Sequence, residues 1–75
     1  MKFAFAYSHK NQRLTLSVED GDRGTELSFE ALDDIIEEFA DVRVIAIEHK
    51  NINQEELFRY VNYIYKVYPD IRVNF

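Results

Sequence analysis

The chain has 75 residues, of which 47% are hydrophobic and 15% aromatic, so we expect one folded domain over residues 1–75 and not a disordered tail. It has no cysteine and no apolar run long enough to span a membrane, which excludes disulfides, thiolate metal sites, cysteine nucleophiles and transmembrane helices and predicts a cytoplasmic protein. Its net charge of −5 argues against direct nucleic-acid binding.

Two segments near the start of the chain alternate between apolar and smaller or polar residues, which is typical of half-buried strands. The first covers residues 2–7 and the second covers residues 13–19, with a hairpin loop expected between them over residues 8–12. The next turn is expected over residues 19–24. Its Asp20–Gly24 stretch lacks the third acid and the later glutamate of a calcium loop, so it predicts a plain turn.

Two amphipathic helices are predicted from apolar stripes of helical period. The first begins at Ser28 as N-cap, with Leu27 and Leu32 as a hydrophobic staple, and the second begins at Asn53 and stops before Pro69. Glu56 completes a capping box for the second helix. The stripes are Leu32, Ile35, Ile36 and Phe39 in the first helix and Leu57, Val61, Ile64 and Tyr68 in the second.

A central strand is predicted over residues 42–47, because both of its faces are apolar, and an edge-like strand over residues 71–75. The element order is therefore ββαβαβ, an α/β (α+β) two-layer sandwich with a four-stranded mixed sheet. Right-handed crossovers favour the strand order 2-1-3-4, with both helices on one face. The other face would carry small and mildly polar residues, namely Ala4, Ala6, Thr15, Ser17, Val44, Ala46, Arg72 and Asn74.

This element order is similar to the core of the STAS domain, the fold of anti-sigma-factor antagonists. That family has a phosphorylatable Asp-Ser-Ser-Gly stretch at the start of the helix after the central strand. The corresponding residues here are Asn51-Ile52-Asn53-Gln54, which include no serine or threonine. The resemblance therefore concerns the fold, and no phosphorylation switch is expected.

The acidic residues are concentrated in one part of the chain. Residues 19–41 contain ten acidic residues and one basic residue, whereas the rest of the chain contains four acidic and eight basic residues. Helical phase places six of the acids away from Leu32: Glu30, Asp33, Asp34, Glu37, Glu38 and Asp41. Either this face is simply solvated and keeps the protein soluble, or it is a docking surface for a basic partner, with mimicry of DNA as a special case.

Tyrosines broaden the apolar stripe of the second helix. Tyr63 and Val67 lie to one side of the stripe, where they either cover the core or belong to an interface. His49, Lys50 and Asn51 lie where the central strand gives way to the second helix, the end of a sheet at which ligands often bind. His9 is expected at the opposite end, so no shared metal site is predicted, and no motif implies a cofactor.

Three hypotheses about function follow. The first is a small non-enzymatic protein-interaction module, a regulator or inhibitor that docks a basic partner through the acidic helix. The second is a small-molecule or anion-binding domain, or a minimal enzyme, that uses the loop around His49. The third is a structural subunit, because the uncovered sheet face or the edge of the last strand would allow the chain to form a homodimer.

Overall fold

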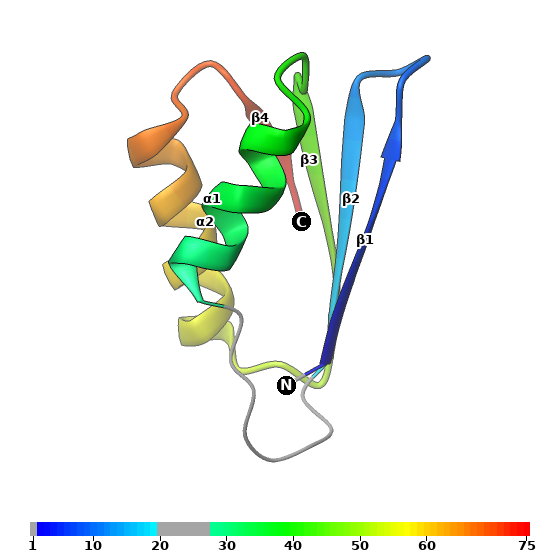
Figure 1. Cartoon of the computed structure of the whole chain (residues 1–75). Helices are drawn as coiled ribbons and strands as arrows, with labels where there is room; N and C mark the ends of the chain where they lie inside the picture. Colours follow the sequence, from blue (N-terminus) through cyan, green and yellow to red (C-terminus); the bar gives the residue numbers. More distant parts are fainter. Residues whose placement is uncertain (1, 20–27) are drawn as a thin grey trace.

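The structure is a computed structural model that describes residues 2–19 and 28–75 (Figure 1). The expected Asp20–Gly24 turn and Leu27 of the expected staple lie outside the described residues. Within the described ranges, four strands and two helices follow each other in the order that the sequence predicts. They are β1 (Lys2–Ser8), β2 (Arg13–Glu19), α1 (Phe29–Glu38), β3 (Val44–Lys50), α2 (Gln54–Val67) and β4 (Arg72–Asn74).

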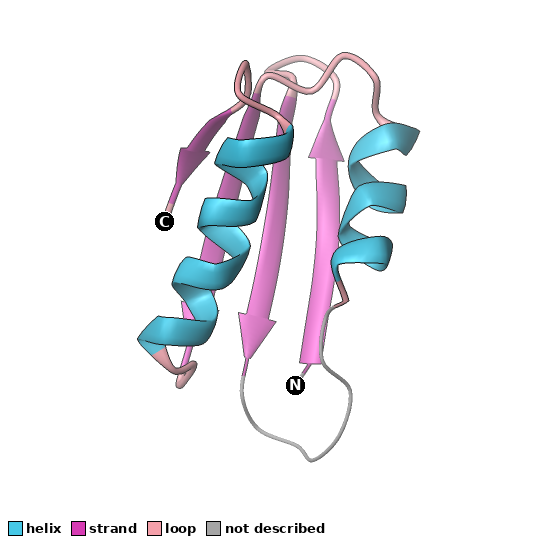
Figure 2. Ribbon diagram, turned by 90° about the vertical axis from the view of Figure 1, so that its left-hand side faces the viewer, coloured by secondary structure: helices cyan, strands magenta, loops and turns pink. Residues whose placement is uncertain are grey.

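The strands form one mixed sheet in the order β1-β2-β3-β4. β1 pairs antiparallel with β2, whereas β2 with β3 and β3 with β4 are parallel pairs. The predicted order 2-1-3-4 is therefore wrong, and the arrangement implied by the resemblance to the STAS domain is not confirmed. The α/β class, the mixed sheet and the two helices on one face are as predicted (Figures 1 and 2).

The order differs because β3 pairs directly with β2, so the connection through α1 joins two neighbouring strands and β1 lies at the edge. Its alternate residues are Phe3, Phe5 and Tyr7, whose large rings are only partly covered, and Phe5 is 43% exposed. In β2 the equivalent residues are aliphatic and at most 3% exposed. Aliphatic side chains thus fill the middle of the sheet, and the rings of β1 close the core at its edge.

Both helices begin at the predicted N-caps. The Ser28 hydroxyl accepts a hydrogen bond from the Ala31 amide at 3.0 Å, and the Asn53 side chain accepts one from the Glu55 amide at 2.8 Å. α1 is shorter than its apolar stripe suggested, because Phe39 is already its C-cap residue. Tyr68 is likewise the C-cap residue of α2, and Pro69 follows it.

β3 begins and ends later than predicted. Val42 is buried ahead of the strand, and β3 continues to Lys50 because its last three residues pair with Ser17, Val18 and Glu19 of β2. β4 covers only the first three residues of β3. No helix in the described parts of the chain combines the length and the apolar character that crossing a membrane requires.

The core lies between the sheet and the two helices. Leu14, Leu32, Ile45 and Ile64 are fully buried there. Figure 2 shows α1 at the β1 end of the sheet and α2 in front of β3. Among the described residues, no helix covers the opposite face of the sheet. Its central residues Ala6, Thr15, Ala46 and Asn74 pair side by side across the four strands, and all four were predicted for this face.

Candidate functional site

The outer surface of α1 is acidic. Glu30, Asp34, Glu37 and Glu38 of α1 and Asp41 just after it are all exposed, and we call these five residues the acidic face. They are exposed because Leu32, Ile35 and Ile36 turn the other side of the helix into the core. Within the described part of the chain, none of the five forms an ion pair.

Asp33 does not belong to the acidic face, which corrects one of the predicted positions. Its carboxylate is partly buried and accepts hydrogen bonds from the Tyr63 and Tyr68 hydroxyls, each at 2.7 Å. Asp33 follows Leu32 and is therefore rotated by about 100° from it around the helix axis. This rotation directs the Asp33 side chain towards α2 and not to solvent. Its carboxylate therefore joins the two helices and is occupied within the molecule.

These hydrogen bonds also affect the two tyrosines. The bond to Asp33, followed by burial and the charges of Asp33 and Glu37, raises the pKa of Tyr63. Burial first, and then the bond to Asp33, raises the pKa of Tyr68. Both hydroxyls therefore stay protonated as donors over the physiological range.

Tyr63 packs against the core, in agreement with one of the two roles that the sequence left open. It is half-buried, and its ring stacks on Phe29 with the centroids 4.3 Å apart and the planes 13° apart. Phe29 also contacts Tyr60 edge-on, and the Arg59 guanidinium lies 5.8 Å from the Phe29 centroid. Val67 is 44% exposed, so of the two predicted interface residues only Val67 presents much surface.

A second aromatic cluster joins the end of α1 to β1. Phe39 stacks on Tyr7 with the centroids 4.3 Å apart and contacts Phe5 edge-on at 6.3 Å. Burial, and then the neighbouring Asp41 carboxylate, raises the pKa of Tyr7 to about 12. The Tyr7 hydroxyl has no hydrogen bond of good geometry among the residues that the structure describes. The carboxyl end of the acidic face thus lies beside β1.

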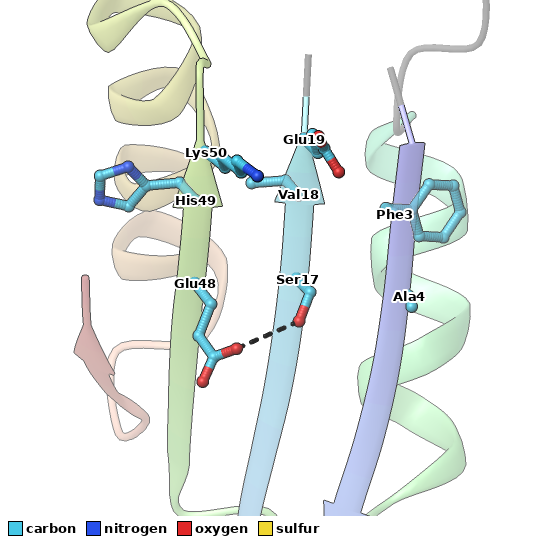
Figure 3. A pocket seen from close by; sticks show the side chains of 8 residues that line it. All are labelled: Phe3, Ala4, Ser17, Val18, Glu19, Glu48, His49 and Lys50. Atoms are coloured by element: carbon cyan, nitrogen blue, oxygen red, sulfur yellow. Dashed lines mark hydrogen bonds between the residues drawn. The ribbon is translucent and has the colours of Figure 1, made fainter. Parts of the chain in front are cut away.

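An open pocket of about 680 Å³ lies where β2 and β3 end and β1 begins (Figure 3). His49 and Lys50 line it, and both belong to β3 and not to a loop, which corrects the prediction. Ser17 donates a long hydrogen bond of 3.4 Å to Glu48 across the uncovered face. The described lining residues are Phe3, Ala4, Ser17, Val18, Glu19, Glu48, His49 and Lys50.

Asn51, the third residue predicted at this end, has a backbone role. It is exposed, has a φ of 57° and does not line the pocket. Asparagine tolerates this left-handed conformation better than most residues, and here it directs the chain from β3 towards α2.

The structure places no metal centre among the residues it describes. No group of three or more histidine, cysteine, aspartate or glutamate side chains is arranged there to hold an ion. His9 packs edge-on against Tyr7 at 4.8 Å, beside the β1–β2 hairpin and at the opposite end of the sheet from His49.

Neither aromatic cluster could be predicted from the helical pattern of α1 or α2 taken alone, because each cluster joins two elements that are distant in the sequence. Two features of the sequence could have indicated a hydrogen bond between the helices: Asp33 borders the apolar stripe of α1, and α2 is rich in tyrosine.

Comparisons with protein-family models, with curated proteins and with solved structures give no match for this chain.

Proposed function

We propose that this protein is a small non-enzymatic interaction module that docks a basic partner protein through the acidic face of α1. The observation that carries the proposal is the exposure of four carboxylates on one side of α1 and of Asp41 just after it, without an ion pair among the described residues. α1 contains no lysine or arginine that would neutralise them.

The stability of the helix gives no reason for this arrangement. Glu30 and Asp34, and Asp34 and Glu38, are four residues apart, where like charges destabilise a helix by a few tenths of a kcal/mol per pair. Glu37 and Glu38 lie in the last turn, where the helix dipole favours positive charge. A lysine at one of these positions would suit the fold better, which supports a role for the acids outside the monomer.

The geometry of the acidic face indicates the kind of partner. Residues four apart on a helix are separated by about 6 Å along its axis, so the carboxylates form a row and not a cluster around one point. A row of this kind matches lysine and arginine side chains spread over a surface or along a segment, and it attracts them from a distance. A regulator or inhibitor of a basic protein is the function that this surface supports best.

The test is affinity capture from a lysate of the source cells, followed by mass spectrometry. One bait is the wild-type protein, and the second carries Asp34→Asn, Glu38→Gln and Asp41→Asn. A matched control carries Glu19→Gln, Glu55→Gln and Asp70→Asn, which remove the same charge from exposed positions outside α1. We expect the wild type and the control to retain basic proteins that the variant with Asp34→Asn, Glu38→Gln and Asp41→Asn does not retain. Added salt should release these proteins from the wild type. Equal retention by all three baits would contradict the proposal.

A second candidate function is supported by the pocket at His49. Its open volume of about 680 Å³ and its mixture of carboxylates, Lys50 and an imidazole would suit a small polar ligand. Screening small polar and anionic compounds by NMR against the wild type, His49→Ala and the matched control His9→Ala tests this function. A ligand of this site would shift the resonances of β2 and β3 near Val18 and His49, and His49→Ala alone would weaken its binding.

A further inference from the structure

The outer side of β1 is a free sheet edge. β1 is the first strand in the sheet order, and all seven of its residues pair with β2 on the inner side. Among residues 2–19 and 28–75, no strand pairs with its outer side. Alternate backbone N–H and C=O groups along this edge are therefore available to another extended chain.

Within its own seven residues, β1 has few of the features that protect such an edge. It contains no proline, its only charged residue is Lys2 at its first position, and it pairs with β2 without interruption by a bulge. Phe5, in the middle of the strand, is 43% exposed. The edge is thus long, regular and partly apolar, which is the form in which a sheet accepts an added strand.

The acidic face borders this edge. Phe39 at the end of α1 contacts Phe5 and Tyr7, so the carboxyl end of the helix lies over the second half of β1. Asp33 accepts a hydrogen bond from Tyr63 of α2, and the charge of Glu37 contributes to the raised pKa of Tyr68 at the end of α2. These two acids therefore lie on the side of α1 that faces α2. Glu38 is about 100° further round the helix than Glu37 and is exposed, so it lies on the side of α1 away from α2. α1 itself lies at the β1 end of the sheet (Figure 2).

We propose that the basic partner binds as an extended segment that adds a fifth strand to the free edge of β1, beneath the carboxylates of Glu38 and Asp41. This inference rests on the proposed function and specifies the form of the partner. The backbone of β1 would supply hydrogen bonds, Phe5 an apolar contact, and the two carboxylates the charge selection.

Electrostatics favour a basic segment over a second copy of the chain at the edge of β1. Two β1 strands paired about a twofold axis would bring two α1 helices, each with its acidic face, to the same junction. Each chain also carries a net charge of −5. Self-pairing at this edge therefore brings like charges together, whereas a basic segment neutralises them.

Strand geometry defines the pattern of the segment. Side chains of an added strand alternate between the two faces of the sheet, as those of β1 do. On the helix side they would meet Phe5 and the acidic end of α1, and on the other side the small side chains of Ala4 and Ala6. The matching sequence therefore carries basic and aliphatic residues in alternation and no proline.

The test uses a short synthetic peptide in which lysine alternates with valine. A control peptide has the same sequence with N-methyl groups on alternate backbone amides, which remove strand hydrogen bonds and leave the charge unchanged. Binding to the full chain is measured by isothermal titration calorimetry. Backbone amide exchange of residues 2–8 is followed by NMR with and without peptide.

We expect the lysine–valine peptide to slow the exchange of the outward-facing amides of β1. Methylation should weaken binding about tenfold or more, because at least two backbone hydrogen bonds are lost. The Glu38→Gln, Asp41→Asn variant should bind roughly three- to tenfold more weakly, whereas Glu55→Gln, Asp70→Asn should bind as the wild type does. Phe5→Thr, which keeps a strand-forming residue, should also weaken binding.

The possible failures are distinguishable. Equal binding of both peptides with unchanged β1 exchange would overturn strand addition and leave acidic-face docking standing. Slowed β1 exchange that is insensitive to the charge variant would support the free edge as a strand-addition site but contradict charge selection and the proposed function. Slow β1 exchange in the absence of peptide, together with the mass of a dimer, would show that a second copy occupies the edge and would overturn the inference.

Discussion

The Tyr68 hydroxyl donates a hydrogen bond to Oδ1 of Asp33 at 2.7 Å, and this contact joins the end of α2 to α1. Tyr63 donates to the other oxygen of the same carboxylate at 2.7 Å. Hydrogen bonds to an ionised acceptor are stronger than those between neutral groups. One acid of α1 is thus part of the fold, whereas its neighbours on the acidic face are exposed.

Replacing Asp33 with alanine should lower the free energy of unfolding by about 2 kcal/mol. The reason is that both tyrosine hydroxyls lose a charged acceptor in a partly buried position. Asp34→Ala is the matched control, because Asp34 is exposed, and it should change the stability by less than about 0.5 kcal/mol. Urea unfolding followed by circular dichroism measures both. Equal losses in the two variants would mean that the Asp33 carboxylate has no structural role.

Stability should fall as the pH rises above the ordinary tyrosine value of about 10. The pKa values of Tyr63 and Tyr68 are raised in the folded protein, and that of Tyr7 is raised to about 12. The folded state therefore retains tyrosine protons that the unfolded chain has lost. The contribution of these tyrosines to stability is complete below pH 10 and is lost as the pH rises through their raised pKa values. Urea unfolding over an alkaline pH series should show this decline, and Tyr68→Phe should make it less steep. A flat profile would count against the raised values.

The order and the type of the elements could be predicted from the sequence, because hydrophobic period and capping residues are local. Ser28 and Asn53 begin helices as their side-chain chemistry requires. The strand order is not local. Whether β1 lies inside or at the edge of the sheet depends on how its rings pack against α1, and Ala4 and Ala6 gave no information on that point.

The candidate site was predictable to a similar degree. A helical wheel places Glu30, Asp34 and Glu38 in solvent without knowledge of the rest of the fold. Asp33 was assigned wrongly because its position depends on α2, which a wheel of α1 does not include. The pocket at His49 could not be predicted without the length of β3, because β3 continues to Lys50 through its pairing with the end of β2.

Neutralising part of the acidic face should leave the fold intact. In the variant with Asp34→Asn, Glu38→Gln and Asp41→Asn, the repulsion between carboxylates one helical turn apart is relieved, so stability should stay equal or rise by a few tenths of a kcal/mol. Thermal unfolding measures the change, and circular dichroism verifies the secondary structure. A large loss of stability would show that these carboxylates hold the monomer together.

We expect the uncovered face of the sheet to be self-complementary. Its middle is made of small side chains around Ala46, which is 5% exposed. Arg13 and Arg72 lie at one end of this face, and Glu48 lies towards the other. If two copies stack face to face with their strands antiparallel, each arginine end meets the glutamate of the partner.

We therefore expect the chain to form a homodimer through this face. Sedimentation equilibrium at micromolar concentration should give twice the single-chain mass of 8.9 kDa for the wild type. Ala46→Glu should return the mass to that of one chain, because two carboxylates would face each other where the sheets approach closely. Ala40→Glu is the matched control, since Ala40 is exposed just after α1 and away from this face, and it should remain dimeric. The single-chain mass for the wild type would contradict the prediction. A dimer that persists in Ala46→Glu would place the contact elsewhere and leave this face free.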